Sequence, residues 1–297
     1  MFKFFLVCFL TKSIVISNSL IFNIKNTSSL STISKSFDFS DQNIFYGDYK
    51  KNIINKYSLD GKLIKKIFLN NKLLRKYSPF KEFRIIDNNK IFLSGKKNRS
   101  LILYDLKTGK IKEAAHKNSK NDIFFKVSNL FKWNQFLLVQ DHLAKSFRIL
   151  SKRANYLSSI HYENDYLIPF GLTELLSIED RVGFSLIEKV FMGGKRTFFY
   201  ECMKTKNDDF VSVYFLGTDK YKNIYLEKLY VLEDNTKKIS ILKISPMGKK
   251  LKEKSFNIGQ FEFNNFDKNF LVSPSSVIFQ LDYLPKEKKL ALKVVDF

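Results

Sequence analysis

The chain has 297 residues and a formal net charge of +22 at pH 7, because 51 Lys and Arg stand against 29 Asp and Glu. It contains 31 Phe and 14 Tyr but only 11 Gly and 5 Pro. This composition, in which Ala is rare, argues against a mainly helical protein and favours pleated, half-buried strands. The length allows one large all-β domain or two average domains.

The first nineteen residues, MFKFFLVCFLTKSIVISNS, have the features of a secretory signal peptide: a basic start, an apolar run and small residues at the end. The alternative is an uncleaved anchor, but Thr11 and Lys12 interrupt the run, and so short a stretch makes a poor transmembrane helix. We expect a signal peptide at 1–19 and a single periplasmic or extracellular domain at 20–297. Loss of Lys3 and Lys12 leaves 22 − 2 = +20 on that domain.

Cys8 and Cys202 are the only cysteines. Cys8 lies too close to the start for a lipoprotein cleavage site and would leave with the signal peptide. The remaining domain can therefore form no internal disulfide, and its core must hold the fold. Cys202, in FFYECMK, alternates with its neighbours as a strand residue does, so we interpret it as a small buried hydrophobe rather than a nucleophile.

Four short strands are predicted near the start of this domain, in KSFDFS, NIFYG, NIINKYS and KLIKKIFL. Each run alternates apolar and polar residues, which is typical of a strand with two different faces. Aspartates mark the turns between them, and the Asp60-Gly61 pair supplies the positive φ that a tight hairpin needs. The expected strands cover residues 35–40, 43–47, 52–58 and 62–69.

The same order of strands and turns recurs along the chain. It is clear in FRIIDNNKIFLSGKKNRSLILYDLKTGKIKEAA, where Thr108-Gly109 replaces Asp60-Gly61, and it is visible without a glycine turn in the third copy. The fourth copy is assigned largely because its neighbours leave room for one, and the fifth is again legible. These copies cover residues 83–115, 129–160, 162–206 and 210–256.

The last segment, FLVSPSSVIFQLDYLPKEKKLALKVVDF, offers three strands and then stops. A sheet without its outer strand would leave a bare edge. A strand-like segment, LIFNIKNT at residues 20–27, is left over at the other end of the domain. We therefore expect it to pair with the C-terminal strand and close a ring.

The recurring form is an apolar pair before a G-D or G-T-D turn, then N-I and a strand ending in Y-S-L-D-G-K or I-S-P-M-G-K. It resembles the NHL-type and related six-bladed β-propellers of bacteria, most strongly over 35–115 and 210–297 and thinly over 162–206. The resemblance implies an all-β, six-bladed propeller with four-stranded antiparallel blades and a period of about 40–45 residues. It implies no activity, because this scaffold hosts lyases, hydrolases, receptors and assembly platforms.

The motifs that carry chemistry are sparse, and no residue is assigned a catalytic role. Some six-bladed propellers are metal-dependent, but His116, His142 and His161 each stand alone in a predicted blade, without the spacing of a zinc site. His142 follows a second strand and could face the channel with Asp141, although a turn residue is the simpler interpretation. We expect no cofactor and no metal. Sequence spacing does not exclude a site assembled from several blades, because a propeller channel gathers residues from each blade.

Other candidates have plain structural interpretations. The aspartates at the predicted turns are read as turn formers rather than catalytic groups: Asp48, Asp60, Asp105 and Asp219. MGGKRT at 192–197 lacks the spacing of a phosphate-binding loop and is interpreted as a hairpin turn, and no serine nucleophile elbow is present.

The excess of lysine attracts anionic partners such as nucleic acid, anionic lipid or glycan. The lysines, however, recur in pairs at predicted hairpin tips, while the aromatic residues fall on strand positions that build a core. A nucleic-acid surface would interleave the two on one face. We interpret the lysines as mainly a solvated surface. The pairs are Lys65 and Lys66, Lys96 and Lys97, Lys249 and Lys250, and Lys288 and Lys289.

Two functions of different classes survive. The preferred one is a secreted or periplasmic binding or scaffold module that presents a channel mouth to a protein, a peptide or an anionic glycan. The alternative is a metal-dependent propeller enzyme of the lactonase or lyase kind, which needs Asp, Glu, Asn or His gathered around the channel. Nucleic-acid binding is a weaker third possibility that export would exclude. We expect a monomer with no transmembrane span in the mature chain.

Overall fold

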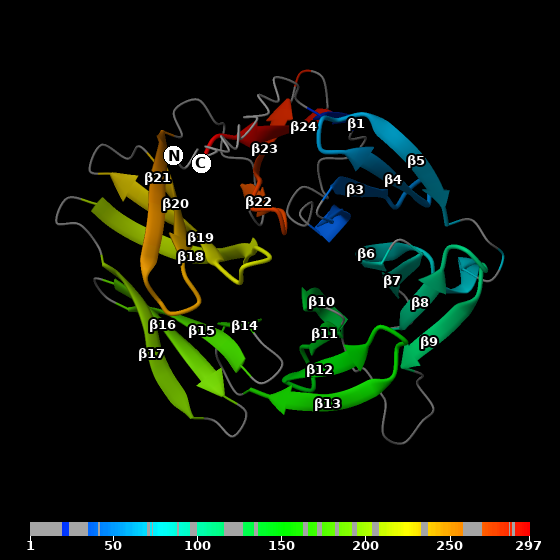
Figure 1. Cartoon of the computed structure of the whole chain (residues 1–297), viewed down its shortest axis with the longest axis horizontal. Coiled ribbons are helices and arrows are strands. Elements are labelled where there is room, and N and C mark those ends of the chain that lie inside the picture. Colours follow the sequence, from blue (N-terminus) through cyan, green and yellow to red (C-terminus); the bar gives the residue numbers. More distant parts are fainter. Residues whose placement is uncertain are drawn as a thin grey trace, which may run out of the picture.

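The computed structural model places six four-stranded antiparallel sheets in a ring, which is a six-bladed β-propeller (Figure 1). The structure describes residues 20–23, 35–40, 42–69, 72, 74–87, 89–95, 100–115, 127–133, 136–162, 166–170, 174–181, 184–191, 195–203, 208–232, 237–257, 269–284, 286 and 289–297. The predicted signal peptide at 1–19 lies outside this part of the chain.

The blades follow one another in sequence order, and four consecutive strands make each of the first five. Blade 1 contains β2 (Phe37–Phe39), β3 (Asn43–Asp48), β4 (Ile53–Ser58) and β5 (Leu63–Phe68). Blade 2 contains β6 (Phe80–Asp87), β7 (Lys90–Gly95), β8 (Leu101–Asp105) and β9 (Ile111–Ala115). Blade 3 contains β10 (Val127–Trp133), β11 (Phe136–Asp141), β12 (Ser146–Ser151) and β13 (Tyr156–His161).

The second half of the ring repeats this order until the last blade. Blade 4 contains β14 (Tyr166–Pro169), β15 (Glu174–Arg181), β16 (Phe184–Phe191) and β17 (Arg196–Met203). Blade 5 contains β18 (Asp208–Thr218), β19 (Ile224–Leu232), β20 (Lys237–Ile244) and β21 (Lys250–Asn257). Blade 6 contains β22 (Phe270–Val272), β23 (Ile278–Leu284), β24 (Lys289–Val295) and, as its outer strand, β1 (Leu20–Asn23).

The first strand of each blade lies toward the centre of the ring and the last lies at the rim (Figure 1). Because every pairing is antiparallel, the first strand of each blade starts on one face of the ring, which we call the entry face. The connections between second and third strands and the connections between blades also lie on the entry face. The opposite face, the exit face, carries the turns between first and second strands and between third and fourth strands.

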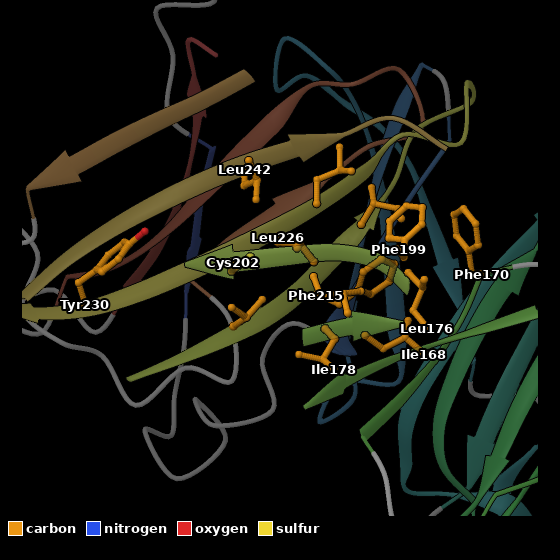
Figure 2. Packing of buried hydrophobic residues seen from close by; sticks show 14 residues of the cluster. Ile168, Phe170, Leu176, Ile178, Phe199, Cys202, Phe215, Leu226, Tyr230 and Leu242 are labelled. Atoms are coloured by element: carbon orange, nitrogen blue, oxygen red, sulfur yellow. The ribbon is translucent and has the colours of Figure 1, made fainter. Parts of the chain in front are cut away.

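Apolar side chains fill the seams between neighbouring blades. Alternation along each strand sends residues to both faces of a sheet, and in this ring both faces meet a neighbour. Figure 2 shows the seam between blades 4 and 5, where Ile168 and Leu176 of one blade belong to the same buried cluster as Phe215 and Leu226 of the next. Cys202 lies in this cluster and is 2% exposed, which confirms its interpretation as a buried hydrophobe.

The ring closes where the two ends of the domain meet. β1 pairs antiparallel with β24, with Leu20 opposite Leu292 and Asn23 opposite Lys289. The seam between blades 6 and 1 is apolar like the others, and Phe39 stacks on Phe279 with ring centroids 5.2 Å apart. The predicted closure by an N-terminal strand is confirmed for residues 20–23; residues 24–27 lie outside the described part of the chain.

The hairpins between third and fourth strands share one turn in blades 1, 2, 3 and 5, where the structure describes them. In these four blades a residue with positive φ completes the turn, and its N–H donates to the carbonyl oxygen of the residue three or four positions earlier. That residue is Gly61, Gly109 and Gly248 in blades 1, 2 and 5, whereas blade 3 uses Ala154 at φ 60°. The third copy keeps the geometry without glycine, which explains why its turn is hard to recognise in the sequence.

Most predicted strands agree with the structure, including the weakly supported fourth blade. Lys65 and Lys66 are an exception, because they lie within β5 rather than at a hairpin tip. Their alternating run continues through both lysines, so the pair belongs to the strand. Lys249 does lie in the hairpin between β20 and β21, as predicted, and Lys250 begins β21.

Removal of Leu20–Asn23 should lower the melting temperature by several degrees. Four cross-strand pairs are worth about 0.2–1 kcal/mol each, and roughly 2–4 °C is lost per kcal/mol in a protein of somewhat smaller size. Differential scanning calorimetry measures the change, with a deletion of residues 1–19 alone as the control. An unchanged melt would contradict closure of the ring by β1.

Two glycine substitutions separate backbone strain from crowding. Gly109 and Gly248 both have positive φ, but a Cβ at Gly109 meets nothing within 4 Å, whereas one at Gly248 would overlap the backbone carbonyl oxygen of Phe199 in β17. Gly109→Ala should cost about 1–2 kcal/mol from the left-handed conformation alone. Gly248→Ala should cost clearly more, because backbone must move. Equal losses in urea unfolding would show that the blade 4 contact is unimportant.

Candidate functional site

The residues that the sequence singled out do not come together in one site. His142 is exposed in the turn after β11, and His161 is exposed at the end of β13, while His116 lies outside the described residues. The Asp141 carboxylate is buried, accepts a hydrogen bond from the Ala144 N–H at 3.3 Å and lies 3.8 Å from Arg148 Nη2. Asp141 therefore holds the turn and the neighbouring strand.

The predicted turn aspartates do form turns. Asp48, Asp105 and Asp219 accept hydrogen bonds from N–H groups two to four residues later. Asp60 accepts one from the Ser58 hydroxyl at its hairpin. The hairpin interpretation of MGGKRT also agrees with the strands, since β16 ends at Phe191 and β17 begins at Arg196.

Asp219 does more than form a turn, because it joins blades 5 and 6. Its carboxylate accepts hydrogen bonds from Asn223, from the Tyr225 hydroxyl at 3.1 Å and from the Ser276 hydroxyl of blade 6 at 2.9 Å. Burial alone would raise the pKa of Asp219, but these donors outweigh it and the net pKa is lowered. Lys243 Nζ lies 3.4 Å away. This carboxylate is fully engaged and is a structural node rather than a site.

A different group of charges lies at the entry-face end of the inner strands of blades 1, 2 and 3. It consists of Lys35, just before β2, and of Lys81, Glu82 and Arg84 on β6, together with the first carbonyl groups of β10. We call it the entry-face cluster. Residues from three blades, about 45 positions apart in the chain, meet here because the inner strands of neighbouring blades are in contact.

Two lysines of the cluster bind the start of β10. Lys35 Nζ donates to the carbonyl oxygen of Ser128 at 2.9 Å, and Lys81 Nζ donates to that of Val127. The register of β10 shifts between Val127 and Asn129, so Ser128 is the extra residue of a β-bulge. A bulge leaves ladder groups unpaired, and the two ammonium groups satisfy its carbonyls.

Glu82 and Arg84 form the buried part of the cluster. Glu82 Oε1 lies 2.7 Å from Arg84 Nη2, and their side chains are 1% and 18% exposed. Arg84 also donates from Nε to the carbonyl oxygen of Leu130 at 2.9 Å and from Nη1 to that of Phe83. Glu82 Oε2 is buried and has no hydrogen-bond partner among the described residues.

The surroundings of Glu82 affect its ionisation in opposite directions. Burial raises the pKa of the carboxyl group, while Arg84, Lys35 and Lys81 lower it, and the net direction is upward. The loss of hydration destabilises the ionised carboxylate of Glu82 more than the three nearby cations stabilise it. The group is therefore easier to protonate than an ordinary glutamate.

Further polar groups lie along the inner strands of blades 1 and 2 and at the entry-face end of blade 3. Asp38 of β2 accepts a hydrogen bond from the N–H of Ile85 at 2.5 Å. In blade 3, Asn129 Nδ2 donates to Gln140 Oε1 at 2.6 Å, and Gln140 Nε2 donates to the Tyr162 hydroxyl at 3.2 Å. The entry-face ends of these blades thus present amide, hydroxyl and ammonium groups.

Cations outnumber carboxylates in this region, three against the two of Asp38 and Glu82. Lys35 and Lys81 are partly exposed, and an ammonium group has three donors. The arrangement is suited to hold an anionic group of a ligand. Among the described residues, no three His, Cys, Asp or Glu side chains lie close enough together to hold a metal ion.

Sequence reasoning missed this cluster. The second copy of the repeat was read from Phe83 onward, which left out Lys81 and Glu82, and a site shared by three blades has no fixed spacing. The available signal was KEFR, where charged residues occur within an otherwise apolar inner strand.

Comparisons with known proteins agree with the fold. No family model and no curated protein matches the sequence. Among solved structures, a member of the DUF4221 family from Bacteroides vulgatus superposes with a TM-score of 0.54 at 13% identity, covering 94% of this chain and 97% of that one. An exported protein of Bacteroides fragilis, described there as putative, reaches 0.50 at 10% identity, covering 94% and 95%.

A third solved structure, a streptogramin B lyase, superposes with a TM-score of 0.49 at 10% identity, covering 94% of this chain and 98% of that one. At such identities the two Bacteroides structures show the propeller fold alone, and the NHL type remains a prediction. No described helix is long and apolar enough to cross a membrane.

Glu82→Gln should gain stability relative to the natural chain as the pH rises from 4 to 7. A carboxyl with a raised folded-state pKa contributes stability at low pH that is lost as the pH rises through that pKa, whereas Gln does not titrate. Each unit of separation from the ordinary value corresponds to about 1.4 kcal/mol. Urea unfolding of both proteins across this pH range measures the difference.

A difference that stays constant with pH would show that Glu82 keeps an ordinary pKa. Glu179→Gln is the matched control, because that carboxylate is exposed beside Arg181 and its pKa is lowered. The control difference should move in the opposite direction or stay flat.

Proposed function

We propose that this chain is a secreted or periplasmic β-propeller binding module, and that its entry-face cluster takes an anionic group of a protein, peptide or glycan partner. The observation that supports this most is the convergence of Lys35, Lys81 and Arg84 from two blades on one end of the ring, against the partly neutralising Glu82. The predicted signal peptide supports the location.

The cluster is prepared for an anion in two ways. Arg84 is held by Glu82 and by two carbonyl groups, so its position is fixed before a ligand arrives. Lys35 and Lys81 each donate to a neutral carbonyl oxygen. Because an ammonium group has three donors and its hydrogen bonds to anions are stronger than those to neutral groups, a ligand anion can be bound here in addition to, or in place of, these carbonyls. The net charge of the chain adds long-range attraction for such a ligand.

Titration of three defined probes tests the proposal: a polyglutamate peptide, an oligogalacturonate and a sulfated oligosaccharide, each by isothermal calorimetry. We expect at least one to bind, more weakly as salt increases. Lys35→Gln with Lys81→Gln should weaken binding about tenfold, which corresponds to roughly 1.4 kcal/mol. The control, Lys110→Gln with Lys152→Gln, removes the same charge from two exit-face hairpins.

Equal weakening by both double variants, or no binding of any probe, would overturn the proposal. The enzymatic alternative is examined on the same sample by measuring bound metal before and after dialysis against Ca²⁺ or Zn²⁺. About one equivalent of tightly held metal with a raised melting temperature would favour the lactonase or lyase kind over a binding module.

A further inference from the structure

The outer strand of blade 1, β5, has an edge to which no described segment is paired. Its inner side pairs with β4 from Phe68 to Leu63, with one irregularity between Lys56 and Tyr57. β5 lies at the rim of the ring, away from the entry-face cluster (Figure 1). The free edge of a strand presents a row of N–H and C=O groups that another strand can join.

The side chains of β5 are unusually apolar for a free edge. Leu63, Ile64 and Phe68 are 42%, 52% and 55% exposed, so half of this six-residue strand consists of exposed large hydrophobic residues. β13 and β17 expose two such residues each and β21 exposes one. An exposed apolar edge strand is a docking or aggregation site unless other features protect it.

The charge of β5 is also uncompensated. Lys65 and Lys66 are exposed, the strand contains no acidic residue, and neither lysine has a carboxylate partner among the described residues. Lys65 is directly opposite Lys56 on β4, a like-charge pair that lowers stability. By contrast, Lys250 and Lys254 of the outer strand β21 lie 3.3 and 3.7 Å from Glu253 and Asp296.

These features select among possible occupants. A second copy of the chain would bring the lysine pairs of two β5 strands together, and lysines on an edge strand prevent such self-pairing. A lipid surface requires its contacts on one side, whereas consecutive residues of a strand point to opposite faces. An extended peptide can bond the backbone edge and meet side chains on both faces.

We propose that the free edge of β5 binds an extended acidic peptide as an added strand, with carboxylates near Lys65 and Lys66 and apolar side chains against Ile64 and Phe68. The lysines then have two effects: they repel another copy of β5 and attract the acidic partner. This surface is separate from the entry-face cluster and does not depend on the function proposed for it.

The probe is a fluorescein-labelled, end-capped peptide of eight residues, Val-Glu-Glu-Val-Val-Glu-Glu-Val. Because consecutive strand residues point to opposite faces, this order can place Glu beside both Lys65 and Lys66 and Val beside Ile64 and Phe68. Its binding to the purified chain is followed by fluorescence anisotropy. We expect saturable binding that Lys65→Glu with Lys66→Glu weakens at least tenfold. Phe68→Ser should weaken it several-fold. The matched control, Lys110→Glu with Lys152→Glu, changes the net charge equally at two distant hairpins and should change the affinity less than threefold.

Two further probes test the mode of binding. The same peptide with alternate residues N-methylated keeps its charges but loses backbone donors, and it should bind at least tenfold more weakly. The same peptide with Lys in place of every Glu should not bind. Hydrogen exchange of the β5 amides should slow when the Glu and Val peptide is present.

Four results would overturn the proposal. The first is that the Glu and Val peptide shows no saturable binding, and the second is that the N-methylated peptide binds as tightly as the unmodified one. The third is that the two double variants lose the same amount of affinity. The fourth is β5-dependent binding to phosphatidylglycerol vesicles that is tighter than binding to the peptide. The melting temperature of each variant verifies that it is folded. Lys65→Glu should not lower the melting temperature, because it removes the repulsion between Lys65 and Lys56.

Discussion

Apolar packing between neighbouring blades is the interaction on which the rest of this structure depends. A single four-stranded sheet of this sequence has side chains suited to burial on both faces, so it cannot be stable alone. Each blade supplies one wall of two seams, and the seam between blades 6 and 1, with Phe39 stacked on Phe279, has the same construction as the others. Cys202 is the only cysteine among the described residues, so no disulfide joins the described blades and this continuity holds them together.

The entry-face cluster is a consequence of that arrangement. Seam packing sets the distance between inner strands, so the β-bulge of blade 3 comes within reach of lysines from blades 1 and 2. The same packing removes water from Glu82, which is why its ionisation depends on burial more than on its three cationic neighbours. Apolar packing between blades therefore sets both the position of this charged cluster and the direction of the pKa shift of Glu82.

The fold was largely predictable from the sequence, because alternation and turn residues are local signals. Asp60-Gly61 and Thr108-Gly109 predicted their hairpins correctly, whereas the blade 3 turn at Ala154 contains no glycine that could indicate it. Lys65 and Lys66 were predicted at a hairpin tip but lie within β5, because a pair of lysines is equally compatible with an exposed turn and with an exposed edge strand. The cluster around Glu82 was not predictable, since only the spatial order of the blades brings its members together.

Closure of the ring joins residues near position 20 to residues near position 290, and this affects the order of folding. The remaining strand pairs form between segments close in sequence, so each blade can assemble soon after its own strands exist. The final pairing instead requires almost the whole chain, and contacts of such separation slow folding although their entropic cost grows only logarithmically with length. Until β1 pairs with β24, the edge of β24 stays open. The chain therefore carries an additional strand edge that can aggregate between the assembly of blade 6 and the closure of the ring.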